Sequence, residues 1–198
     1  MSSFRSEPFL WIHLTGIVLV PLWLEIVWLG LSIGTPLLWF WLELLLLAVV
    51  GILPILWMQL VRPFDIFSIL LFSVKPEQLS SEQRQILAQF KTRSHRIVSI
   101  ITAIMMILIL WFLDSFAPLL IPINPWSQGW HLIGLIIAAV SLLASNLFLQ
   151  VPVSVLRILL SNQASLAATE PLPSDQIARE FTIPGFWIDS ILAKEQLG

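Results

Sequence analysis

The sequence predicts an all-α integral membrane protein: four transmembrane helices with cytoplasmic amphipathic segments. Of its 198 residues, 58% are hydrophobic and 11% are charged, and the mean hydropathy is +0.92. A soluble domain carries about 25% charged residues. The apolar residues form four runs, each long enough to cross a hydrocarbon core of about 30 Å. These runs lack the alternation of barrel strands, and helices are the other structure that can span lipid.

The four predicted spans form two hairpins, over residues 10–33, 37–60, 97–121 and 132–151. The short connections within the hairpins contain no Lys or Arg, so all ten basic residues lie on the other side. Basic loops are retained in the cytoplasm. We therefore expect both termini and the middle loop to be cytoplasmic. The first span is too long for the hydrophobic segment of a signal peptide and should remain as a helix.

The predicted organisation has five parts. They are a cytoplasmic N-terminus (1–9), a first transmembrane hairpin (10–60), a cytoplasmic loop (61–96), a second hairpin with a kinked extension (97–160), and a cytoplasmic linker and docking tail (161–198). The residues after Pro152 are predicted to form a kinked continuation of the span or an interfacial helix, and Arg157 is expected to reach the lipid headgroups.

The loop is predicted to contain two helices. Pro63–Val74 is apolar but too short to span, which favours an interfacial helix or a re-entrant segment. Ser80 followed by Gln83 resembles a capping box and predicts the start of an amphipathic helix. That helix is either a solvated element attracted to anionic lipid or a docking platform for a partner.

The tail carries more apolar surface than a free tail needs. The candidate docking residues are Phe181, Phe186, Trp187, Ile188, Ile191 and Leu192. Such a surface lies on the membrane or is held by another protein, and we expect the second.

Small residues predict close helix packing. Gly30 and Gly34 form a GxxxG pair at the end of the first span. A stripe of small residues follows the fourth span and consists of Gly134, Ala138, Ser141 and Ser145. The stripe packs against the first span or against a foreign helix, and the sequence leaves both open.

Three acidic residues are candidates for ion or proton handling, because ionisable groups are costly within a membrane. Glu25, Glu43 and Asp114 are all placed in the non-cytoplasmic half of the predicted bundle. Three carboxylates at one depth could hold a cation or relay protons. No Lys or Arg lies within the spans to pair with them.

His13 is a candidate pigment ligand, because an imidazole nitrogen can bind the metal of a chlorophyll or a haem. His131 is expected near the opposite boundary, so these two histidines cannot form one bis-histidine site. The sequence specifies no cofactor; chlorophyll, carotenoid or lipid could bind at the periphery.

Other function classes have little support. The absence of cysteine excludes disulfides and thiolate metal sites. The net charge of −2 gives no reason to expect a nucleic-acid partner. The sequence contains no Walker loop and no GxGxxG, HExxH or GxSxG motif. We therefore expect a protein that is not an enzyme.

Two sequence strings resemble those of a known family. They are SFRSEPFLWIHL at residues 3–14 and GILPILWMQLVRPFDIFSILLFSVKPEQLS at residues 51–80. With the four-span layout, they resemble the cyanobacterial low-complexity-tail membrane proteins over residues 1–160. The family has no established activity, so no catalytic residue is carried over. The resemblance implies a cyanobacterial host and a thylakoid or plasma-membrane location.

These features together predict an accessory or assembly subunit that associates with membrane lipids and with a larger membrane complex. The implied cyanobacterial host makes a photosynthetic complex the expected partner. Two alternatives remain at this point: a small ion or solute transporter that uses the intramembrane carboxylates, and a pigment-binding subunit.

Overall fold

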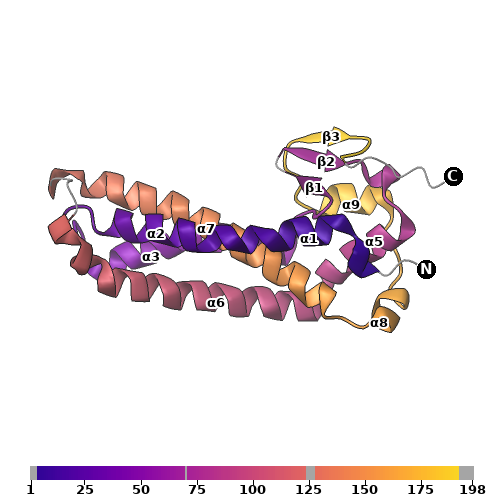
Figure 1. Cartoon of the computed structure of the whole chain (residues 1–198), viewed down its shortest axis with the longest axis horizontal. Helices are drawn as coiled ribbons and strands as arrows, with labels where there is room; N and C mark the ends of the chain where they lie inside the picture. Colours follow the sequence, from indigo (N-terminus) through magenta and orange to yellow (C-terminus); the bar gives the residue numbers. More distant parts are fainter. Residues whose placement is uncertain (1–3, 70, 124–127, 192–198) are drawn as a thin grey trace.

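The computed structural model describes residues 4–69, 71–123 and 128–191. Long helices run along the long axis of the molecule, and short elements gather at one end (Figure 1). Four helical stretches are long and apolar enough to cross a membrane: Pro8–Leu31, Trp41–Val61, Arg93–Leu120 and His131–Leu159. The prediction of an all-α membrane protein with four transmembrane helices is confirmed.

The first span is built from three consecutive helical segments, which are α1 (Pro8–Thr15), η2 (Gly16–Val18) and α2 (Leu19–Leu31). A short helix, η1 (Phe4–Ser6), precedes them. Pro8 stands at the start of α1, where its missing N–H removes no intrahelical hydrogen bond.

The second span is interrupted at Ile52, between α3 (Phe40–Gly51) and α4 (Leu53–Val61). Pro54 lacks an N–H and cannot continue the regular bonding pattern. The side-chain amide of Asn146 donates to the carbonyl of Ile52 at 3.1 Å. The same amide also donates to the carbonyl of Gly51 at 3.4 Å, so a polar group on a neighbouring helix bonds to the backbone at the interruption.

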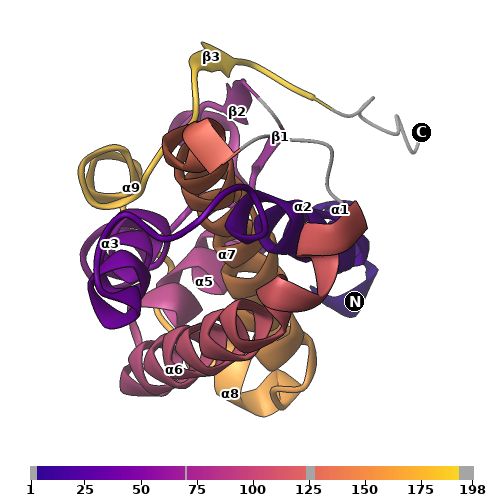
Figure 2. The ribbon, with the colours of Figure 1, turned by 90° about the vertical axis from the view of Figure 1, so that its left-hand side faces the viewer.

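The third span is α6 (Arg93–Phe116), which continues into η5 (Ala117–Ile123), and the fourth is α7 (His131–Leu159), which follows η6 (Gln128–Trp130). Figure 2 shows α7 between α2, α3 and α6, all of which it contacts. The extension predicted after Pro152 is part of α7 itself, which contains Pro152 and ends at Leu159. The final turns of α7 are buried in the protein.

Helices α2 and α7 approach closely at Gly30 and Gly134. A Cβ atom placed on Gly30 would lie 2.7 Å from the carbonyl oxygen of Gly134 and 2.9 Å from the backbone nitrogen of Ala138. The small residues of the fourth span therefore pack against the first span of the same chain. Gly34 lies beyond α2, where a φ of 73° turns the chain.

Two apolar cores lie one after the other along the molecule. The bundle core consists of Val20, Val27, Leu47, Ile52, Ala103, Met106, Leu110, Leu135, Ala138, Leu142 and Leu149. The second core holds together the short elements at the end of the bundle, and its buried residues are Phe4, Phe9, Leu10, Ile66, Phe67, Val74, Leu79, Ile86, Leu87, Phe90, Val155, Ile158, Leu159, Leu166, Ile177 and Phe181. We call residues 4–15, 62–92 and 155–191 the head.

The described residues of the loop segment Pro63–Val74 form no helix, so the prediction of an interfacial helix there was wrong. It contains β1 (Ser68–Ile69) and β2 (Phe72–Val74), which pair antiparallel with Ser68 opposite Ser73. Ile66 and Phe67 are fully buried in the head core. These two side chains are therefore covered by protein rather than by lipid.

The amphipathic helix predicted from Ser80 is confirmed. Helix α5 (Ser81–Ala88) follows η3 (Pro76–Gln78), leads into η4 (Gln89–Lys91) and has the complete capping box. Its side chains Ile86 and Leu87 are fully buried in the head. The apolar face of α5 is thus covered by the chain itself and forms no exposed docking platform.

Arg157 turns toward the protein instead of the lipid headgroups. Its guanidinium donates to the carbonyl of Gln89 at 2.6 Å and to the hydroxyl of Thr92 at 3.1 Å. These bonds connect α7 to the start of α6. The expectation that Arg157 reaches the headgroups was wrong.

The tail folds back onto the loop. After α8 (Gln163–Ala167) and α9 (Ser174–Glu180), β3 (Phe186–Ile188) pairs parallel with β2 and completes a sheet of order β1-β2-β3. Thr182 exchanges backbone hydrogen bonds with Pro63 and Asp65 at 2.9 and 3.0 Å. Parallel pairing needs a partner from far along the chain, so local sequence patterns did not reveal this sheet.

A Gly185→Ala substitution is expected to weaken the attachment of the tail. Gly185 has a φ of 79°, and a Cβ atom there would overlap the carbonyl of Leu71, which accepts a hydrogen bond from the Phe186 N–H at 2.7 Å. Such backbone strain costs about 1–3 kcal/mol. Limited proteolysis should therefore cleave the tail of the variant faster. Gly129→Ala, which has open space around its Cβ position, is the matched control; equal cleavage rates would contradict the prediction.

Candidate functional sites

The three candidate carboxylates do not form one site. Glu25 is exposed on the surface of α2, whereas Glu43 is buried near the start of α3. Asp114, near the end of α6, is half-buried and close enough to Glu43 for the two charges to interact. The structure thus brings two of the three acidic residues near each other and leaves the third outside.

Glu43 is bonded on both carboxylate oxygens. Its Oε1 accepts from the backbone N–H groups of Leu37 and Leu38 at 2.8 and 2.9 Å. Its Oε2 lies 3.0 Å from Nε2 of His131, and Nδ1 of the same ring lies 2.7 Å from the carbonyl of Ile33. One buried pair therefore connects the turn between the first two spans to the start of the fourth.

The geometry of this pair requires a shared proton. A carbonyl only accepts, so Nδ1 of His131 must donate to Ile33. The bond between Nε2 and Glu43 then needs one further proton, carried by the imidazole or by the carboxyl group. The pair is a satisfied acid–imidazole contact that closes this end of the bundle.

His131 as the partner of Glu43 was missed by sequence reasoning, which looked for Lys or Arg. The sequence does contain a signal for this pairing, because the second and fourth spans both start on the side that carries no basic residue. Residues near the starts of two such spans lie at similar depth. The pairing itself still required the packing of α3 against α7.

A second group of polar side chains is buried between α4, α6 and α7. His95 Nε2 contacts the carbonyl of Gln59 at 3.2 Å, and the Gln150 amide donates to the carbonyl of Ser99 at 3.2 Å. Within the described part of the chain, the Gln59 amide and the Ser99 hydroxyl have no hydrogen-bond partner. Sequence reasoning placed His95 in the loop, but it is a fully buried residue of α6.

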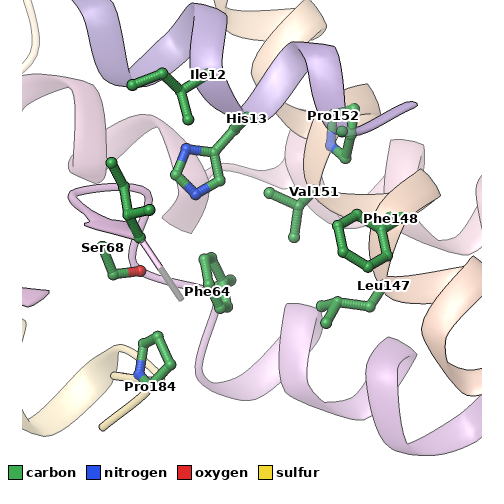
Figure 3. A pocket seen from close by; sticks show the side chains of 11 residues that line it. Ile12, His13, Phe64, Ser68, Leu147, Phe148, Val151, Pro152 and Pro184 are labelled. Atoms are coloured by element: carbon green, nitrogen blue, oxygen red, sulfur yellow. The ribbon is translucent and has the colours of Figure 1, made fainter. Parts of the chain in front are cut away.

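A cavity of about 320 Å³ lies where the first and fourth spans meet the sheet. In Figure 3, His13 reaches into this space from α1, with Phe64 and Ser68 on one side and Phe148 and Val151 on the other. His13 Nδ1 lies 2.9 Å from the carbonyl of Phe9. The lining is otherwise almost entirely apolar.

Asp65 is a buried acid in the head that sequence reasoning did not single out. Its Oδ1 accepts from the N–H of Phe67 at 2.9 Å, while its Oδ2 has no partner among the described residues. Burial raises the pKa of Asp65 to about 6. When this buried carboxyl group is ionised, it destabilises the head.

The predicted docking residues of the tail separate into two groups. Phe181 is fully buried and Ile191 packs against the head core, so neither presents a surface to a partner. Phe186 and Trp187 are 70% and 38% exposed. Ile188 is half-buried in β3, and Leu192 lies outside the described residues.

The exposed residues of β3 adjoin those of the β1–β2 turn. Leu71 and Phe72 are 61% and 50% exposed, and Phe72 pairs with Phe186 in the sheet. We call Leu71, Phe72, Phe186 and Trp187 the apolar tip. Figure 1 shows the sheet to one side of the bundle, beside α1.

Among residues 4–69, 71–123 and 128–191, no group of three or more His, Cys, Asp or Glu side chains is placed to hold a metal ion. The Glu43–His131 pair has its hydrogen bonds satisfied within the protein. The apolar tip and the cavity beside His13 are open to another molecule.

Comparison with known proteins identifies the family. A family model described as low-complexity tail membrane protein-like matches residues 6–193. This match includes the tail, beyond the region in which the sequence resemblance was noted. No curated protein and no solved structure matches the chain. A family match over nearly the whole length, together with four membrane-spanning helices, places this chain in the low-complexity tail membrane protein-like family.

Proposed function

We propose that this membrane protein is a non-enzymatic accessory or assembly subunit, and that its apolar tip binds a larger membrane complex. The observation that carries the proposal is the exposure of four large apolar side chains on a folded sheet. Phe72 and Phe186 lie opposite each other in the sheet, and a protein surface seldom exposes several large apolar side chains together without a binding role. The tip belongs to the head, whose core residues are covered by its own chain.

The sheet favours a protein partner over lipid. Strand β3 is an edge strand, with β2 on one side. An edge strand presents backbone N–H and C=O groups that another strand can pair with, whereas hydrocarbon cannot satisfy them. Addition of a strand to such an edge is a recurring mode of peptide recognition. The exposed rings beside the edge would add apolar contact.

The proposal extends to the setting of the protein. Because the head end carries the basic residues, we place the head in the cytoplasm. We place the protein in a thylakoid membrane, with the plasma membrane as the other location. A photosynthetic complex is the first partner to test, since the sequence resembles cyanobacterial proteins.

The test replaces exposed side chains that contribute little to the fold. A Leu71→Ser, Phe186→Ser double variant should lose the partner, because both side chains are largely exposed and their backbone hydrogen bond is kept. Membranes are extracted gently, separated on a native gel, and the band with this chain is analysed by absorbance and mass spectrometry. We expect wild type in a large complex and the variant at monomer or small-oligomer size.

The matched control is Leu160→Ser, which removes an equally exposed leucine (75%) at the end of α7, outside the tip. This variant should migrate like wild type. Retention of the tip variant in the large band would contradict docking through the tip. Wild type in a small, colourless band would contradict the accessory-subunit proposal itself.

A further inference from the structure

We propose that the cavity beside His13 binds a neutral, membrane-resident hydrocarbon that carries a hydroxyl group, and that this hydroxyl donates a hydrogen bond to Nε2 of His13. Prenyl alcohols and prenylated phenols have this chemistry. The proposal concerns a ligand site and does not depend on the apolar tip or its partner.

The hydrogen bonding of His13 determines which kind of group it can bind. Nδ1 faces the carbonyl of Phe9 at 2.9 Å, and because a carbonyl only accepts, Nδ1 carries the proton. In the neutral ring, Nε2 is then an acceptor. Among the described residues, the His13 ring makes this one hydrogen bond, and Nε2 takes no part in it. Figure 3 shows the lower ring nitrogen pointing into the space above Phe64.

The rest of the lining selects for an apolar body. Ile12, Phe64, Phe148 and Val151 surround the space, and a volume of about 320 Å³ falls within the range of small-molecule pockets. The hydroxyl of Ser68 already donates its proton to the carbonyl of Asp65. Ser68 therefore has no proton left to donate to Nε2, which stays free to accept from an incoming donor.

Because the described lining carries no Lys or Arg, we do not expect phospholipids to be the best ligands. The cavity is lined by no Lys or Arg among the described residues, so a phosphate group would have no cation to compensate its burial. The cavity adjoins the bilayer, because Ile12 and Phe148 belong to helices that are long and apolar enough to span it. A neutral lipid alcohol satisfies both conditions.

The experiment compares two probes that differ in one hydrogen-bond donor. Farnesol and its methyl ether share an apolar body, but only farnesol can donate to Nε2. Their affinities are measured for the full-length protein in detergent micelles, with partition into empty micelles subtracted. We expect farnesol to bind about 2- to 12-fold more tightly, as one neutral hydrogen bond allows.

Two variants connect the preference to the cavity. His13→Phe keeps an aromatic ring but removes the acceptor, so the preference should fall to about 1-fold while the ether keeps its affinity. Gly16→Leu should weaken both probes, because a Cβ atom there already lies 3.3 Å from the Phe148 ring and a larger side chain enters the cavity.

Three results would overturn the proposal. The first is equal binding of farnesol and its ether to wild type, which needs no variant to interpret. The second is a preference for farnesol that persists in His13→Phe. The third is tighter binding of a lysophospholipid than of farnesol, since the cavity would then recognise a charged headgroup.

Discussion

Replacing Glu43 with Leu is expected to destabilise the protein by about 3–5 kcal/mol, the usual cost of removing one partner of a buried pair. The leucine cannot accept from the N–H groups of Leu37 and Leu38, and it leaves Nε2 of His131 buried without a partner. The midpoint of unfolding in mixed micelles of a mild and a denaturing detergent measures the effect.

Glu43→Gln is expected to be far milder, within about 1 kcal/mol. The amide oxygen can accept the same two backbone bonds, and the amide nitrogen can donate to a neutral His131, whose other nitrogen still donates to Ile33. If Glu43→Gln lowers the stability as much as Glu43→Leu does, the charge of Glu43 stabilises the protein rather than its hydrogen bonds.

The same variants separate this structural role from transport. Glu25→Leu is the matched control, because Glu25 is exposed on α2 and should change stability little. A transporter that uses Glu43 would instead lose flux in proteoliposomes when Glu43→Gln is introduced, while remaining folded. Unchanged stability with abolished flux would favour transport over the structural role that the hydrogen bonds indicate.

The head is expected to lose stability as the pH rises from about 4 to 7, because Asp65 must ionise while buried. The pKa of Asp65 is about 6 in the folded head, whereas an unperturbed Asp, as in the unfolded chain, has a pKa of 3.8. A raised pKa means that the folded state holds the proton more tightly, so the stabilisation is complete below about 4 and is lost above 6. The difference corresponds to about 3 kcal/mol.

An Asp65→Asn variant tests this directly. The amide oxygen keeps the bond from the Phe67 N–H, and the side chain no longer ionises. At pH 7 the variant should be more stable by about 2–3 kcal/mol, whereas at pH 4 it should match wild type. Thermal unfolding across this pH range supplies the measurement, with Asp175→Asn, an exposed acid of α9, as control. Parallel curves for wild type and Asp65→Asn would contradict the prediction.

The sequence alone determined the membrane-spanning part of this protein. The lengths of the apolar runs predicted four helices because hydrocarbon forces every backbone group in a span to be bonded internally. The capping box at Ser80 was also readable, since its two hydrogen bonds join residues three apart. Both are local signals, and both are confirmed.

Only the tertiary structure decided what the remaining residues do. The apolar segment after Pro63 was predicted to form an interfacial helix, but a strand from residues 186–188 pairs with it, and its Ile66 and Phe67 belong to the head core. Glu43 was predicted to form an ion or proton site with two other carboxylates. In the structure its partner is His131, which lies 3.0 Å away although 88 positions separate the two residues in the sequence. A local pattern shows that a side chain is apolar or ionisable, whereas its partner depends on how distant segments pack.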